Sequence, residues 1–129
     1  MTTLHRILHV DDEEYIRELV HIALTELSTL EVDGYGGAAE LMANPPHVLP
    51  DLLLLDVMMP EIGGPALLAT LQEQADFASI PVIFMTAESR KTETEKLFTQ
   101  NVIGVLSKPI NLTTLANDIQ ALWTSAQAT

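Results

Sequence analysis

The sequence has no cysteine, few positive charges and few aromatic residues. The absence of cysteine excludes disulfides, thiolate metal sites and cysteine nucleophiles, so any chemistry must come from oxygen and nitrogen groups. Six lysines and arginines stand against eighteen aspartates and glutamates, which gives a formal charge of −12. Such a surface repels phosphate backbones and anionic bilayers, so we expect no direct nucleic-acid partner and no membrane partner.

Long apolar runs are missing as well. No window approaches the length of a membrane span, and no apolar stretch before Asp11 is long enough for a signal peptide, so we expect a cytoplasmic protein. The length of 129 residues matches one average domain. We therefore expect a single domain over residues 1–129, with a core of about 4–124 and no output domain in this chain.

The sequence does contain short apolar runs that alternate with segments of helical periodicity. This alternation predicts an α/β fold with a five-stranded parallel sheet covered on both faces. The strands are expected at 4–10, 30–35, 51–55, 80–85 and 102–106. Helices are expected on an apolar stripe from Ile16 to Leu27, over 37–43, 65–75 and 89–100, and in a last segment that Asn111 caps. Of these, 89–100 is mostly polar and should be marginally packed, with Leu97 and Phe98 as its anchors.

Polar side chains follow four of the predicted strands. They are Asp11 and Asp12, Asp56, Thr86 and Lys108. Because the carboxyl ends of parallel strands meet at one edge of a sheet, we expect these five groups to converge. Three neighbouring carboxylates repel one another unless a cation lies among them. Hard oxygen ligands favour Mg²⁺, with Mn²⁺ or Ca²⁺ as substitutes.

Each of these residues also has a plainer interpretation. The run Asp11-Asp12-Glu13-Glu14 would suit the N-cap and acidic first turn of a helix, and one aspartate could cap while its neighbour binds metal. Lys108 could be a solvated lysine at a strand end, and Thr86 an ordinary strand former. Asp56 is harder to explain in this way, because it ends an otherwise wholly apolar strand, where a carboxylate is costly without a purpose. Beside a cation, this carboxylate could attack a phosphoryl group.

Four motifs in order resemble the receiver domains of two-component response regulators, over nearly the whole chain. Asp12, Asp56, Thr86 and Lys108 follow one another at spacings of 44, 30 and 22 residues. The matching segments are Ile7-Leu8-His9-Val10-Asp11-Asp12-Glu13, Asp51-Leu52-Leu53-Leu54-Leu55-Asp56-Val57-Met58-Met59-Pro60 with Gly64, Pro81-Val82-Ile83-Phe84-Met85-Thr86-Ala87, and Lys108-Pro109.

This resemblance implies a flavodoxin-like (βα)5 three-layer sandwich with strand order 2-1-3-4-5. It implies a signalling phosphoacceptor rather than an enzyme, in which Asp56 receives a phosphoryl group from a sensor histidine kinase or a histidine phosphotransfer protein. Asp12 and Asp56 would contact Mg²⁺ directly and Asp11 mainly through water, while the backbone carbonyl of Met58 would add a ligand.

The resemblance also implies a switch. Thr86 would move toward the phosphoryl group beside Ala87, Lys108 would hold that group from the other side, and the bond before Pro109 would be cis. The surface of the fourth helix, last strand and last helix would then change its affinity for a downstream protein, with the chain a monomer or weak dimer. Met58 and Glu88, each two residues after a key position, would tune access of water.

The family usually has an aromatic residue where this chain has Val105, so the coupled movement of threonine and aromatic ring is in doubt here. Three rival functions stay open. A flavodoxin-like electron carrier would need a Gly, Ser and Thr-rich loop after the first strand, where this chain has four acidic residues. An aspartate phosphatase would place its nucleophile at the end of that first strand. A receiver-like interaction module would work without phosphorylation.

Overall fold

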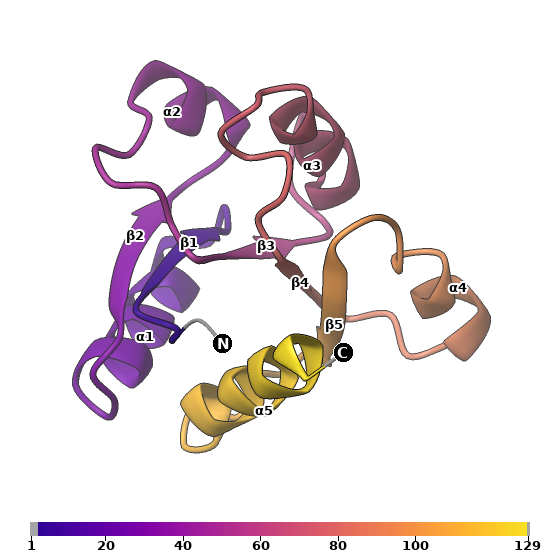
Figure 1. Ribbon diagram of the computed structural model, residues 1–129. Coiled ribbons are helices and arrows are strands. Elements are labelled where there is room, and N and C mark those ends of the chain that lie inside the picture. Colours follow the sequence, from indigo (N-terminus) through magenta and orange to yellow (C-terminus); the bar gives the residue numbers. More distant parts are fainter. Residues whose placement is uncertain (1–2, 129) are drawn as a thin grey trace.

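The computed structural model describes residues 3–128, in which five parallel strands alternate with five helices (Figure 1). The strands are β1 (Arg6–Val10), β2 (Glu31–Tyr35), β3 (Leu52–Asp56), β4 (Val82–Thr86) and β5 (Val102–Ser107). The helices are α1 (Glu14–Thr25), α2 (Ala38–Ala43), α3 (Gly64–Gln72), α4 (Lys91–Glu95) and α5 (Leu115–Gln127). The sheet order is β2-β1-β3-β4-β5, which confirms the predicted topology. Residues 1, 2 and 129 of the predicted domain lie outside the described residues.

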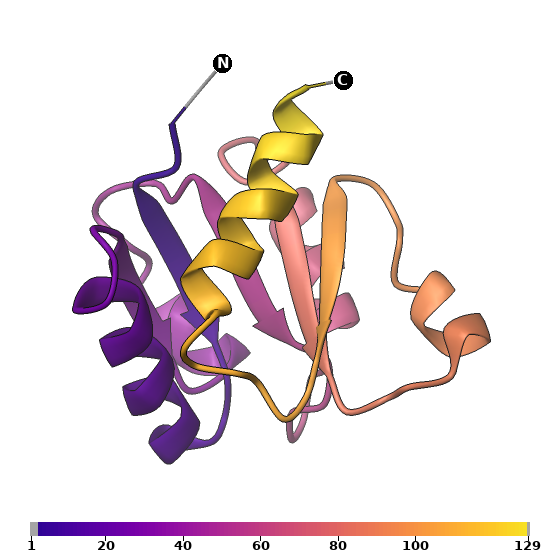
Figure 2. The ribbon, with the colours of Figure 1, turned by 90° about the horizontal axis from the view of Figure 1, so that it is seen from below.

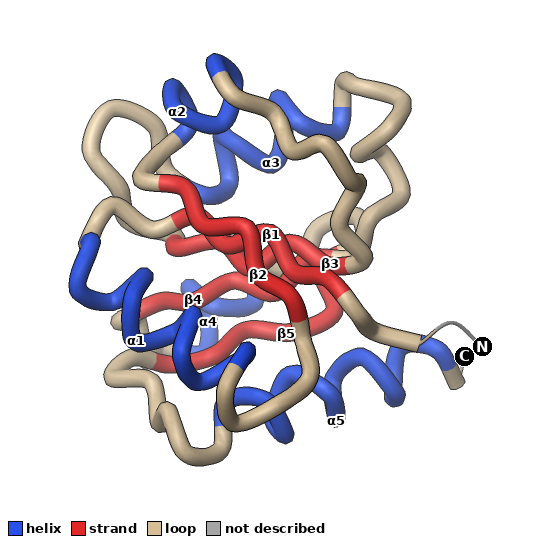
Figure 3. The backbone as a smooth tube through the Cα atoms, turned by 90° about the vertical axis from the view of Figure 1, so that its left-hand side faces the viewer, coloured by secondary structure: helices blue, strands red, loops and turns tan. Residues whose placement is uncertain are grey.

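Helices cover both faces of the sheet, with α2 and α3 on one side and α1 and α5 on the other (Figure 3). The sequence of β3 explains this arrangement, because successive residues of a strand point to opposite faces. Leu52 and Leu54 pack with α1 and α5, whereas Leu53 and Leu55 pack with α2 and α3. All five residues of β3 are buried, as expected of a central parallel strand.

The pairing register aligns the strand ends that carry the candidate site. Val10 pairs with Leu55 across β1 and β3, Asp56 with Met85 across β3 and β4, and Thr86 with Ser107 across β4 and β5. The residues that follow β1, β3, β4 and β5 therefore lie along the same edge of the sheet. This is the edge at which open parallel sheets bind ligands.

Several predicted helix boundaries are wrong, among them those of α1 and α5. Helix α1 ends at Thr25, and Leu27, which we expected on its buried stripe, lies beyond the end and is 67% exposed. Leu24 is buried in its place. Helix α5 begins after Thr114 rather than after Asn111, because the Asn111 side chain instead accepts a hydrogen bond from the Thr113 amide in a preceding turn. The buried residues of α5 are Leu115, Ile119 and Trp123.

Helix α4 is shorter than the predicted helix over 89–100. Its five residues are all polar and none is buried. Leu97, just after it, is partly buried and packs on the α2 and α3 side of the core, but Phe98 is 53% exposed and anchors nothing. In Figures 1 and 2, α4 lies to the side of the sheet beyond β5. The expectation of a marginally packed segment is therefore confirmed.

Within residues 3–128, every helix is too short or too polar to cross a bilayer.

Candidate phosphoacceptor and metal site

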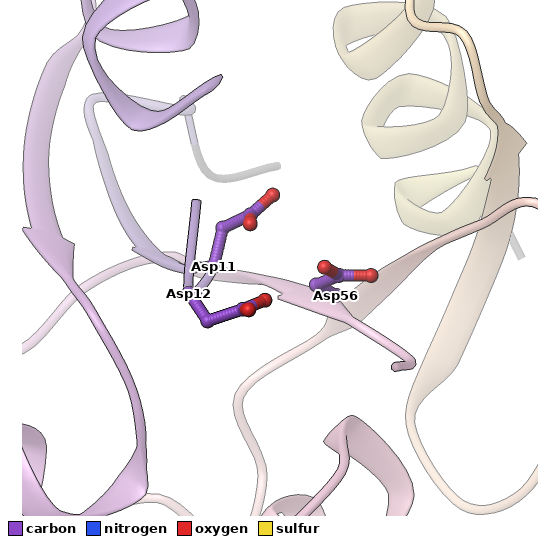
Figure 4. Close-up of side chains that lie close together, drawn as sticks. All are labelled: Asp11, Asp12 and Asp56. Atoms are coloured by element: carbon purple, nitrogen blue, oxygen red, sulfur yellow. The ribbon is translucent and has the colours of Figure 1, made fainter. Parts of the chain in front are cut away.

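Three aspartates from two strands gather at the carboxyl edge of the sheet (Figure 4). Asp11 and Asp12 directly follow β1, and Asp56 is the last residue of β3. Each offers a carboxylate oxygen, and these three oxygens lie within 4.8 Å of one another. Asp11 and Asp56 are buried, whereas Asp12 is exposed to solvent. The predicted convergence of acids thus occurs, with one side of the cluster open to an incoming group.

The environment of Asp11 fits a bound cation. Burial raises the pKa of its carboxyl group to about 6; the backbone amide of Glu13 opposes this rise and the charge of Asp56 adds to it. Within the described chain, Oδ2 of Asp11 is buried without a hydrogen-bond partner. A divalent cation supplies the positive charge that such an oxygen lacks. Three carboxylates, with open solvent for water ligands, suit Mg²⁺ better than a metal that demands nitrogen or sulfur.

The interpretation of the acidic run as a helix start holds for Glu14, which lies in the first turn of α1, but neither Asp11 nor Asp12 is the cap. The N-cap of α1 is Glu13, and its side chain makes no capping hydrogen bond. Asp11 instead accepts the Glu13 amide on Oδ1 at 2.9 Å, which fixes the turn between β1 and α1. The other oxygen, Oδ2, lies 3.9 Å from Nζ of Lys108.

Lys108 brings the positive charge of the site. Its Nζ donates to Oδ2 of Asp56 at 2.9 Å and lies 3.9 Å from Oδ2 of Asp11. Burial alone would lower the pKa of Lys108, but its hydrogen bond to Asp56 and the nearby negative charges outweigh burial and raise the pKa. The peptide bond between Lys108 and Pro109 is cis. Lys108 is therefore no free surface lysine but the partner of the buried carboxylate.

Thr86 ends β4, and Glu88 belongs to the loop that follows this strand. Oγ1 of Thr86, the last residue of the strand, accepts the Glu88 amide at 3.0 Å. The Thr86 carbonyl accepts the Lys108 amide at 2.8 Å, so the loops after β4 and β5 are joined at this residue. The Glu88 carboxylate faces Arg90, which holds its pKa at about 2, chiefly by side-chain hydrogen bonds. In this state Glu88 is thus engaged by Arg90.

A cavity of about 520 Å³ lies between the loops that follow β3 and β4. Its lining includes Met58, Thr86, Ala87 and Glu88, four of the predicted site residues. Met58 is 76% exposed, and its amide lies 3.3 Å from Oδ1 of Asp56. Its side chain therefore lies at the open side of the buried carboxylate.

Val105 is an ordinary strand residue. It is partly buried, pairs with Phe84 and packs on the α2 and α3 side of the core.

Two residues next to the site were not predicted to belong to it. Arg17 donates from Nη1 to the backbone carbonyl of Asp11 at 2.7 Å. His9 is fully buried, but neither ring nitrogen has a hydrogen-bond partner among the described residues. The signal for His9 was in the sequence, because residues two apart on a strand share a face, and Asp11 follows His9 by two.

The comparisons with known proteins agree with this geometry. The family model for the response regulator receiver domain matches residues 7–120, and the chain belongs to this family. The response regulator Rre1 of Synechocystis sp. is 34% identical over 122 residues, which cover 95% of this chain and 53% of Rre1. RpaA, a DNA-binding dual master transcriptional regulator of the same organism, is 31% identical over 91% of this chain and 48% of its own length.

Solved structures share the whole fold. The Vibrio cholerae chemotaxis protein CheY4 superimposes with a TM-score of 0.81 at 25% identity, covering 93% of this chain and 99% of that chain. A response regulator from Desulfuromonas acetoxidans gives a TM-score of 0.79 at 26% identity, over 93% of this chain and 97% of that one. The chain thus spans a whole CheY4 structure but only about half of Rre1 and RpaA. It is a receiver, a signalling phosphoacceptor module rather than a conventional enzyme.

Proposed function

We propose that this chain is a phosphorylation-dependent receiver whose Asp56 accepts a phosphoryl group from a phosphohistidine on a sensor histidine kinase or a histidine phosphotransfer protein in the cytoplasm. The observation that carries the proposal is the 2.9 Å contact between Lys108 and the buried Asp56 carboxylate, beside two further aspartates. A buried, charge-paired aspartate at an open sheet edge is what an activated carboxylate nucleophile requires.

The transfer step needs a carboxylate that is both ionised and accessible. An oxygen of Asp56 attacks the phosphorus, and the phosphorus–nitrogen bond of the donor breaks. The electron pair stays on the nitrogen as the lone pair of a neutral imidazole. Mg²⁺ held by Asp12 and Asp56, with the Met58 carbonyl and with Asp11 through water, would neutralise charge on the transferred group. Lys108 stabilises the same charge from the other side of the carboxylate.

The change of charge at Asp56 acts on the loop that follows β4. A phosphorylated aspartate adds strong acceptor oxygens, and the Thr86 hydroxyl, whose oxygen now accepts the Glu88 amide, is free to donate to one of them. Movement of Thr86 shifts the Ala87 and Glu88 backbone at the start of the segment that carries α4. Because α4 has no buried residue, little packing opposes its displacement. The α4-β5-α5 surface then presents a changed face to a downstream protein.

Labelling by a small acyl-phosphate donor tests the phosphoacceptor. With Mg²⁺, the wild-type protein should gain one phosphoryl group that is lost on mild alkaline treatment, as an acyl phosphate is. Asp56→Asn should take up none, and Asp76→Asn, an exposed aspartate away from the site, should label like the wild type. Labelling of Asp56→Asn at the wild-type level overturns the assignment. Failure of the folded wild type to label would favour the receiver-like module that works without phosphorylation.

A further inference from the structure

His9 is a buried polar residue that the phosphotransfer chemistry does not use. It lies in β1 with no exposed surface, between Leu8 and Val10 of the core. By the alternation of the strand, its ring faces the α1 and α5 side of the sheet, as Ile7 does. Neither Nδ1 nor Nε2 has a hydrogen-bond partner among the described residues. Most buried polar groups in proteins are hydrogen-bonded, so this ring calls for an explanation.

The nearest unsatisfied acceptor belongs to the acidic site. Nε2 of His9 lies 3.9 Å from Oδ2 of Asp11, and both residues are fully buried. This oxygen is the third of the three unsatisfied buried side-chain atoms in the described chain, and the two nitrogens of His9 are the others. The separation exceeds a direct hydrogen bond by about 1 Å, a gap that a small side-chain rotation or one bridging water closes.

We propose that His9 is a positioning residue for the metal site: its Nε2–H donates to Oδ2 of Asp11, directly or through one water, and holds this carboxylate in place. The proposal rests on the magnesium site proposed above. Oδ1 of Asp11 is already fixed by the Glu13 amide at 2.9 Å. A second hydrogen bond on Oδ2 fixes both oxygens and thus the plane of the carboxylate, as outer partners of metal ligands do.

The charges around His9 agree with a neutral ring that donates. Burial is the main reason that its pKa is lowered to about 3, and the positive charges of Arg17 and Lys108 lower it further. A neutral imidazole carries one N–H, and a proton on Nε2 is the one directed to Asp11. Leucine or valine at this position would fill the core equally well but would leave Oδ2 without this donor.

Substitutions of His9 separate its hydrogen bond from its packing. In His9→Gln, the side-chain amide reaches the position of Nε2, whereas in His9→Asn it reaches only that of Nδ1. His9→Leu keeps the bulk and removes both nitrogens. We expect Mg²⁺ affinity, measured by titration calorimetry, to fall about tenfold in His9→Leu and His9→Asn and to stay within about twofold of wild type in His9→Gln. Equal affinities in all folded variants, or equal losses, would sink the proposal.

A second measurement needs no metal and no phosphoryl transfer. The ¹⁵N shifts of the His9 ring report which nitrogen is protonated and whether it donates a hydrogen bond. In metal-free protein, Nε2 should carry the proton, and its shift should change in Asp11→Ala but not in Asp12→Ala. A proton on Nδ1, or a ring indifferent to Asp11→Ala, would overturn the positioning role. If the wild type binds no Mg²⁺ or takes up no phosphoryl group, the proposed function fails while this result still decides on His9.

Discussion

His9 and Asp11 predict that two pH effects on stability cancel in the metal-free protein. Folding lowers the pKa of His9 from 6.5 to about 3, mainly by burial, and raises that of Asp11 from 3.8 to about 6, also mainly by burial. At pH values between the unfolded pKa of Asp11, 3.8, and its folded pKa, about 6, the unfolded chain binds a proton on His9 and the folded chain binds one on Asp11. Both states therefore hold one proton on the pair, and the free energy of unfolding should not depend on it.

Single substitutions should expose the two opposing slopes. Without His9, the folded state alone binds a proton, on Asp11, so stability falls as the pH rises. From about pH 5 to about pH 6.5, these pKa values give a loss of about 1 kcal/mol in His9→Gln. In Asp11→Asn, the unfolded state alone binds a proton, on His9, and stability should rise by about 1.5 kcal/mol over the same range. The wild type should change by less than about 0.5 kcal/mol.

Urea unfolding followed by circular dichroism in the presence of a chelator measures these slopes. The range lies above the pI of about 4.4, so the protein keeps a negative net charge. Each variant should be compared with itself across pH, since its absolute stability also reflects packing. Parallel pH profiles for the wild type and both variants would refute the reasoning, because they would show that neither group changes its proton affinity on folding.

Two further predictions concern the first residue of α3 and the metal. A Cβ at Gly64 would lie 2.4 Å from the Asp56 carbonyl oxygen, so Gly64→Ala should destabilise the fold by about 1–3 kcal/mol in urea unfolding. Gly37→Ala is the control and should be nearly neutral, because its Cβ would meet nothing within 4 Å. Equal effects of the two substitutions would contradict the steric explanation. Mg²⁺ at about a hundred times its dissociation constant should raise the unfolding free energy by about 2.7 kcal/mol. At the same Mg²⁺ concentration, Asp12→Asn should lose most of this gain in unfolding free energy. Without metal, the variant should be more stable than the wild type, because one repelling charge is gone. An undiminished gain with Mg²⁺ would exclude Asp12 from the metal site.

The sheet and the acidic edge could be predicted because both depend on local patterns. Four consecutive leucines in β3 identify a strand buried on both faces, and parallel pairing then carries Asp56 to the same edge as Asp11. The two-residue period of a strand also decides which side chains share a face. These regularities hold whatever the rest of the chain does.

The ends of helices and the side-chain contacts within loops could not be predicted in this way. The apolar period of α1 runs on to Leu27, but the helix ends at Thr25, and nothing in the period marks this end. Asparagine is a residue type that often caps helices, but the Asn111 side chain caps a separate turn before α5. The contact between Glu88 and Arg90 depends on the conformation of one loop. In each case several local structures suit the same residues, and the sequence pattern does not select among them.

The exposure of α4 means that its residues are less constrained in evolution than the residues of the acidic site. Substitutions among its polar residues remove no core contact, so they change the free energy of folding little. The aspartates and Lys108 have no such freedom, because each is needed by its neighbours at the sheet edge. Under the proposed function, a lineage could exchange the proteins that bind α4 while it keeps Asp56 as the phosphoacceptor, and signalling targets could then diverge without a more stable scaffold.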